Sequence, residues 1–161
     1  MNKKEFHFSF DVYHSTEELS KEDAALLNEA RKTTAQAYAP YSNFKVGAVA
    51  KLSNGELVSG TNQENASYPV GLCAERVLLA SVASRYQNVT IDTIAISYHN
   101  YNGESDRPVS PCGICRQSLL EYEERTNQPI RLILSGMKGD VIVVEKASQL
   151  LPLSFGSDDL K

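Results

Sequence analysis

The sequence contains few cysteines and no long apolar segment. With only three cysteines in 161 residues, a scaffold held together by disulfides is excluded. The apolar runs, such as residues 141–144, are too short to cross a membrane, and residues 1–14 have no continuous apolar core of the kind that a signal peptide needs. These absences lead us to expect a cytoplasmic protein whose cysteines stay reduced.

The sequence also has no excess of basic residues. The 16 lysines and arginines are outnumbered by 20 aspartates and glutamates, which gives a formal net charge of −4. A broad basic face for nucleic acid is therefore not expected. Internal repeats, low-complexity tracts and flexible linkers are absent as well, so one domain is the simplest organisation.

The composition fits a globular domain that follows a short extension. The chain is 42% hydrophobic and 22% charged, which is ordinary for a protein large enough to bury its own core. We assign residues 1–19 to an N-terminal extension and residues 20–161 to the domain.

The extension carries the periodicity of a strand. Phe6, Phe8, Phe10 and Val12 alternate with polar residues, which predicts a strand over residues 5–13. Such a strand has to pack against its own domain or against a neighbouring subunit.

The domain contains local signals of both helices and strands. Ser20 can cap a helix that ends before Pro40, and Asn54-Gly55 is the expected turn of a hairpin. The order of elements predicts an α/β sandwich with a mixed sheet and helices on both faces. The other expected elements are helices near 73–86, 112–125 and 147–152, strands over 93–97, 130–135 and 141–145, and a polar loop over 98–110.

The cysteines are placed in a way that favours a metal site. Cys112 and Cys115 lie three apart at the expected start of one helix, so both sulfurs can reach one ion, and Cys73 lies at the start of another. Helix N-termini favour the thiolate, which is the form that binds zinc. Three protein ligands leave one tetrahedral position open, as in catalytic zinc sites. Glu75 follows Cys73 closely enough to move protons beside such a site without ligating the metal.

Four blocks of the sequence resemble the cytidine deaminase family. The letters CAE at 73–75 and PCGIC at 111–115 match the signature of the zinc nucleoside and nucleobase deaminases. In chain order, the blocks are YAPYSNFKVGA, NQENASYPVGLCAER, SPCGICRQ and LLPLSFGSDDL, and together they span residues 38–160. Residues 1–19 have no clear match in the family pattern.

The resemblance implies a fold, a reaction and an assembly. The implied fold is a three-layer αβα sandwich with a mixed sheet of about five strands. The implied reaction is the zinc-dependent hydrolytic deamination of cytidine and deoxycytidine to uridine and deoxyuridine in pyrimidine salvage. The implied assembly is a homotetramer with one zinc ion per chain, with its sites at subunit borders and with a small nucleoside, not a nucleic acid or a membrane, as its partner.

The resemblance also implies roles for the residues at the metal site. The three cysteines would hold the zinc ion. Glu75 would carry a proton from the attacking water to N3 of the pyrimidine and then help to protonate the leaving amine. Arg76 would hydrogen-bond a ligating sulfur and so offset the negative charge of three thiolates.

A second group of residues would bind the nucleoside. Asn62 and Glu64 match a pair that binds the ribose 3′-hydroxyl, and Glu64 would repel the 3′-phosphate of a nucleic acid. Phe155 matches an aromatic residue that stacks on the base from a neighbouring subunit, whereas Ser67 and Ala74 would read the pyrimidine edge through their backbones. The expected substrate contacts are Phe44, Asn62, Glu64, Ser67, Ala74 and Phe155.

Other interpretations of the same residues remain open. Cys112 and Cys115 alone also fit a redox pair of thioredoxin type. A closed structural zinc site would need a histidine (His7, His14 or His99) as its fourth ligand. An enzyme of this family could instead act on a modified cytosine nucleoside such as a nucleoside antibiotic, or the chain could be a catalytically silent zinc module used for assembly. Editing of polynucleotides is disfavoured by the acidic charge.

Overall fold

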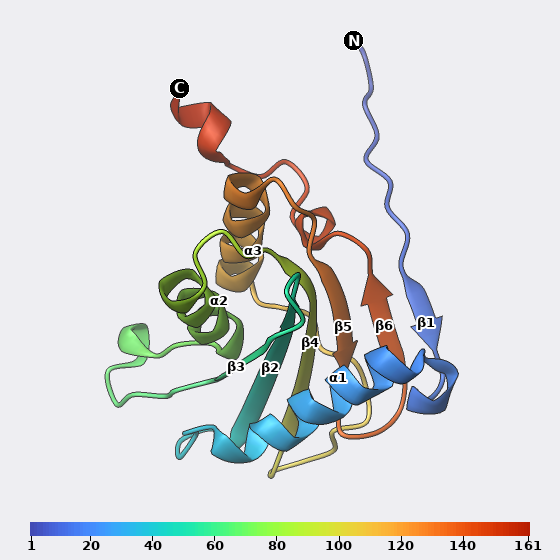
Figure 1. Ribbon diagram of the computed structural model, residues 1–161, viewed down its shortest axis with the longest axis vertical. Coiled ribbons are helices and arrows are strands. Elements are labelled where there is room, and N and C mark those ends of the chain that lie inside the picture. The colour runs from blue at the N-terminus through green and yellow to red at the C-terminus, as the bar shows by residue number, and fades with distance from the viewer.

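The computed structural model describes residues 1–161 and shows one mixed sheet between two layers of helices (Figure 1). Its six strands lie in the order β1-β6-β5-β4-β2-β3, with β4 and β5 parallel and every other pair of neighbours antiparallel. The strands are β1 (Asp11–Tyr13), β2 (Phe44–Leu52), β3 (Leu57–Thr61), β4 (Ile91–Asn100), β5 (Arg131–Ser135) and β6 (Val141–Val144), and the helices are α1 (Lys21–Thr33), α2 (Ala74–Arg85) and α3 (Gly113–Thr126).

Helices cover both faces of the sheet, which confirms the predicted αβα sandwich. Leu27 of α1 packs on one face in a cluster that includes Ile133. Leu78 of α2 and Leu119 of α3 pack on the opposite face in a larger cluster that includes Ile94. These five side chains are at most 1% exposed, so the sheet is buried on both sides. None of the helices combines the length and the apolar composition that crossing a membrane requires.

The strand predicted over residues 5–13 is shorter than expected. Only Asp11–Tyr13 pairs, antiparallel to Val141–Val143, and it adds a sixth strand at the edge of the sheet where about five were expected. In the observed register Phe10 would lie opposite Val144, the last residue of β6, so β6 offers at most one more partner to the residues before Asp11. The earlier part of the extension is exposed and lies outside any helix or strand.

The polar segment 98–110 is not a loop throughout. β4 continues to Asn100, and its last three residues pair with Phe44–Val46 at the start of β2. The remainder of the segment is anchored, since the buried Ser105 hydroxyl accepts a hydrogen bond from the Asn100 N–H at 2.8 Å. A Cβ at Gly136, in the β5–β6 connection, would lie 2.2 Å from the Ser105 carbonyl oxygen. This close packing fixes the path by which the chain enters α3.

The local signals at the first helix and the hairpin are confirmed. The Ser20 hydroxyl accepts a hydrogen bond from the Asp23 N–H at 3.1 Å and so caps α1. The β2–β3 hairpin turns at Asn54-Gly55, where Gly55 adopts a φ of 87° that side chains rarely tolerate. Three 3₁₀ turns, Thr16–Glu18, Tyr68–Val70 and Ser157–Leu160, were not predicted.

Candidate active site

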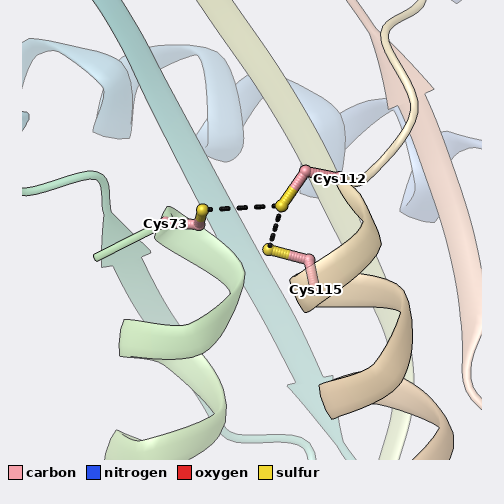
Figure 2. A group of neighbouring side chains, drawn as sticks. All are labelled: Cys73, Cys112 and Cys115. Carbon is pink, nitrogen blue, oxygen red and sulfur yellow. Dashed lines mark hydrogen bonds between the residues drawn. The ribbon is translucent and has the colours of Figure 1, made fainter. Parts of the chain in front are cut away.

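The three cysteine thiols meet where α2 and α3 begin (Figure 2). Cys73 is the N-cap residue of α2, Cys112 is the N-cap residue of α3, and Cys115 lies in the first turn of α3. The Sγ atoms of Cys73 and Cys112 are 3.8 Å apart, those of Cys112 and Cys115 are 3.5 Å apart, and all three lie within 4.8 Å of one another. Two thiolates at about 2.3 Å from one tetrahedral zinc ion would be about 3.8 Å apart. The sulfurs are therefore spaced to share one ion.

A glycine in β3 brings the Cys73 end of α2 onto the sheet. A Cβ at Gly60 would lie 2.5 Å from the Ala74 carbonyl oxygen and 2.5 Å from the Leu78 backbone nitrogen. No side chain fits in that space, so the first turn of α2 rests directly on the strand. This contact sets how close the start of α2, and with it Cys73, lies to the sheet.

The charge balance of the thiols also fits a metal ion. The Cys115 thiol lowers the pKa of its neighbour Cys73 to about 6, against the opposing effect of burial. The same proximity to Cys73, together with burial, raises the pKa of the Cys115 thiol above its usual value. Three adjacent thiols thus ionise together only if a cation neutralises them. Zn²⁺ favours such a set of soft thiolate ligands.

No histidine joins the thiol cluster. His7 hydrogen-bonds Glu5, His14 hydrogen-bonds Asp140, and His99 stacks on a tyrosine ring. A closed zinc site with a histidine as fourth ligand therefore gains no support. The three thiols would leave one position open on a tetrahedral ion.

A cavity of about 690 Å³ opens beside the thiols. Cys73, Cys112 and Glu75 line it, whereas Cys115 is fully buried. Glu75 lies in the first turn of α2 and is only 5% exposed, and its burial raises the pKa of its carboxyl above the usual 4.5. The volume is within the range of roughly 300–1,000 Å³ that is typical of small-molecule sites.

Arg76 lines the same cavity as Cys73 and Cys112. Its side chain makes no hydrogen bond to a sulfur, so the contact expected from the sequence is not seen. Its positive charge still adds to the lowering of the Cys73 pKa, after the larger effects of the neighbouring thiols. In this structure, Arg76 therefore acts on the thiolates only through its charge.

Glu64 lines the cavity as an ionised acceptor. Its carboxylate accepts hydrogen bonds from the Tyr41 N–H at 2.9 Å, from the Ser42 N–H at 3.3 Å and from the Ser42 hydroxyl. The hydroxyl and the two backbone donors lower the pKa of Glu64 below 4.5. A carboxylate has about four acceptor sites. One acceptor site therefore remains for a hydroxyl in the cavity.

Asn62 holds the start of β2 beside the cavity. Its side-chain carbonyl accepts from the Val46 N–H at 2.7 Å, and its side-chain N–H₂ donates to the Phe44 carbonyl at 2.9 Å. Both Asn62 and Phe44 line the cavity. The Asn62 amide donates only this one hydrogen bond, so its second hydrogen is available to a ligand.

Three of the residues predicted to bind substrate lie outside the cavity lining. Ser67 is exposed, and its backbone groups already bond to Asn65 and Val70. Ala74 is buried beneath the site as the first residue of α2, where a backbone N–H has no partner within the helix. Phe155 is 59% exposed on the C-terminal tail, and its carbonyl accepts a hydrogen bond from the Gln117 side chain of α3 at 2.9 Å.

The structure also brings in residues that were not predicted from the sequence. Tyr98 lines the cavity and is only 5% exposed, and Ser42 holds Glu64. Arg116 donates hydrogen bonds to the Pro111 carbonyl at 2.8 Å and to the Leu150 carbonyl at 3.0 Å, which braces the turn before α3. Ser42 and Arg116 both lie in sequence blocks that resemble the cytidine deaminase family. The sequence alone, however, did not indicate their contacts.

A family model described as the cytidine and deoxycytidylate deaminase zinc-binding region matches residues 20–127, which include all three cysteines and Glu75. The chain belongs to the cytidine and deoxycytidylate deaminase family. This result confirms the family, the fold class and the zinc-binding character that the sequence predicted.

Individual deaminases match over most of the chain. A cytidine deaminase of Halalkalibacterium halodurans is 36% identical over 135 residues, which are 84% of this chain and 95% of the relative. The crystal structure of cytidine deaminase from Burkholderia pseudomallei superposes with a TM-score of 0.70 at 37% identity, covering 85% of this chain and 100% of that one. A blasticidin-S deaminase of Bacillus cereus is 31% identical over 85% of this chain and 94% of the relative.

Proposed function

We propose that this protein is a zinc-dependent cytidine deaminase that converts cytidine and deoxycytidine to uridine and deoxyuridine in pyrimidine salvage. The observation that carries the proposal is the buried carboxyl of Glu75 in a cavity wall that it shares with Cys73 and Cys112. A proton-transfer group beside a metal site with an open position is the arrangement that hydrolytic deamination needs. We place the protein in the cytoplasm, because its thiols must stay reduced to bind zinc.

In this proposal, Glu75 moves the protons of the reaction. Bound zinc would be held by the three cysteines and would supply the Lewis acidity that lets a water molecule lose a proton near neutral pH. Glu75 accepts that proton and delivers it to N3 of the pyrimidine while the water oxygen bonds to C4. Glu75 then takes the remaining proton from the oxygen on C4 and passes it to the exocyclic nitrogen, so that the C4–N bond breaks, C4=O forms and ammonia leaves. A carboxyl whose pKa is raised by burial is suited to both steps, since it accepts a proton more readily than an exposed carboxyl and can still pass that proton on.

Other residues in and around the cavity orient the nucleoside. The free acceptor site of Glu64 and the free amide hydrogen of Asn62 suit the ribose 3′-hydroxyl. Phe44 packs against the pyrimidine, and the N–H of Ala74 meets its polar edge. The ionised Glu64 disfavours a 3′-phosphate, so a free nucleoside is the expected substrate and a polynucleotide is not.

We further propose that the enzyme is a homotetramer with sites at subunit borders. Phe155 supports this arrangement because its ring is exposed while its backbone is tied to α3, so the ring faces outward to another subunit. The cavity borders exposed apolar side chains that such a contact would cover, namely Tyr68, Leu72 and Ile114.

A deaminase of modified cytosine nucleosides is the second candidate, because the chain is also similar to a blasticidin-S deaminase. The ribose contacts that we propose for Glu64 and Asn62 favour cytidine. A competition assay with cytidine and a modified cytosine nucleoside distinguishes the two candidate functions.

The test is a paired assay of wild type and Glu75→Gln, with zinc per chain determined on the same samples. We expect wild type to convert cytidine, followed by the loss of its absorbance, and the variant to keep its zinc but lose about 10²–10⁴-fold in kcat. Glu56→Gln, the same change on the exposed β2–β3 turn, should behave as wild type. Zinc-loaded wild type that leaves cytidine and deoxycytidine unchanged would contradict the proposal. Equal activity in Glu75→Gln would remove Glu75 from the chemistry.

A further inference from the structure

The N-terminal extension presents a row of apolar side chains that nothing in the chain covers. Phe6, Phe8, Phe10 and Val12 are 55%, 40%, 49% and 47% exposed. The ring centroids of Phe6 and Phe8 are 6.3 Å apart and those of Phe8 and Phe10 are 6.1 Å apart, so the rings form one continuous row. A contiguous apolar row on a soluble surface marks an interaction site.

The same segment lies at an open sheet edge. β1 pairs with β6 on one side and has no strand on the other. Residues before Asp11 run beyond the end of β6 and away from the sheet (Figure 1). Both the side chains and the backbone of this segment are therefore available for pairing with another chain.

We propose that residues 5–13, here called the arm, pair with the arm of a second copy as antiparallel strands about a two-fold axis at Ser9. A two-fold contact needs a self-complementary surface. If one residue faces a second residue of the other copy, then that second residue also faces the first residue of the other copy. The arm has this property in one register only.

The apolar row selects the register. With the axis at Ser9, Phe6 faces Val12 of the second copy and Phe8 faces Phe10, so every apolar side chain meets an apolar one. Moving the axis to Phe8 puts Val12 opposite Lys4. Moving it to Phe10 puts Phe6 opposite a histidine. An axis between two residues would pair the apolar face of one arm with the polar face of the other.

The polar face selects the same register. With the axis at Ser9, His7 faces Asp11 of the second copy, which is a donor opposite an acceptor, and Glu5 faces the hydroxyl-bearing ring of Tyr13. With the axis at Phe8, Glu5 and Asp11 would be directly opposite, and like charges in that position destabilise a sheet. Charge and apolar matching therefore agree on a second copy of this chain as the occupant.

The test is a disulfide at the proposed axis. In zinc-loaded Ser9→Cys, the two introduced cysteines would have Cα atoms about 4.5–5.5 Å apart, within the range that a disulfide spans. We expect mild oxidation to convert most of the chain into a covalent dimer on a non-reducing gel. Glu5→Cys is the matched control, because its two cysteines would be about 26 Å apart in this register and would stay unlinked.

Two further samples decide the outcome. Wild type under the same oxidation reports any linkage through the native cysteines. Phe8→Asp added to Ser9→Cys should prevent the dimer, because it places an aspartate against a phenylalanine ring. Absence of the dimer in Ser9→Cys, or equal dimer in Glu5→Cys, would overturn the proposal. The readout is independent of activity, so it stands or falls separately from the deaminase assignment.

Discussion

Phe44 and Tyr98 stack on each other from neighbouring strands, with ring centroids 4.8 Å apart and ring planes inclined by 10°. Phe44 begins β2, and Tyr98 lies diagonally across from it in β4, where it pairs with Val46. Tyr98 is buried and Phe44 is partly exposed, and both line the cavity. Tyr98 therefore fixes the plane of the ring that we expect to meet the pyrimidine.

We expect Phe44→Ala to weaken substrate binding more than catalysis. An aromatic ring that stacks on a base contributes about 1–3 kcal/mol, so KM for cytidine should rise about 5- to 150-fold while zinc content stays unchanged. Tyr98→Phe keeps the stack and should leave KM close to the wild-type value. Steady-state kinetics on both variants measure this difference, and an unchanged KM in Phe44→Ala would place the base elsewhere in the cavity.

Features encoded within a few residues could be predicted from the sequence, and features that depend on strand register could not. The Ser20 cap, the hairpin at Asn54-Gly55 and the cysteines at two helix starts are all local, and the structure confirms them. Tyr98 was assigned to a loop, because only its pairing with β2 shows that β4 continues past Ser97.

The length of the strand in the N-terminal extension also could not be predicted from the sequence. Its alternation of phenylalanine and polar residues predicted a strand over residues 5–13, and only Asp11–Tyr13 form one. How much of it pairs depends on where β6 ends, which the arm itself does not encode. Likewise, the contacts of Arg116 to two distant carbonyls follow from tertiary packing alone.

We expect Ser42→Ala to change the titration of Glu64. The Ser42 hydroxyl is the main cause of the lowered Glu64 pKa, so its removal should return that pKa toward 4.5. The folded-state pKa of Glu64 is depressed, so its ionised form and the binding that depends on it are present above 4.5 and are lost as pH falls through the lowered value. The variant should lose them at a higher pH. Carbon NMR of the side-chain carboxyl measures the shift, with Ser59→Ala on the exposed face of β3 as the control.

Arg116→Met should weaken zinc binding without changing the chemistry of the loaded enzyme. Arg116 positions the turn before α3 through the Pro111 carbonyl, next to the ligand Cys112. Loss of partners that orient metal ligands typically costs about 10–100-fold in metal affinity. Competition with a chelator measures the affinity, and kcat per bound zinc should stay constant. The same change at the exposed Arg125 of α3 should have no effect, and equal zinc affinity in both variants would show that Arg116 only supports the fold.

Gly60→Ala should damage the site although residue 60 does not touch it. Its new Cβ would meet the Ala74 carbonyl oxygen and the Leu78 nitrogen at 2.5 Å, so α2 has to move away from β3. Overpacking of this kind costs about 1–3 kcal/mol in unfolding free energy, which denaturant titration measures. The displacement also carries Cys73 and Glu75 away from α3, so kcat/KM and zinc affinity should fall together.

The control for this prediction is the same substitution closer to the metal site. A Cβ at Gly113, between the ligands Cys112 and Cys115, would meet no atom within 4 Å. Gly113→Ala should therefore leave zinc affinity and stability near wild type, even though it lies next to two ligands in sequence. If Gly113→Ala lost zinc while Gly60→Ala kept it, the close packing of α2 on the sheet would not determine the spacing of the thiols. The flexibility of the turn at Cys112 would then determine that spacing.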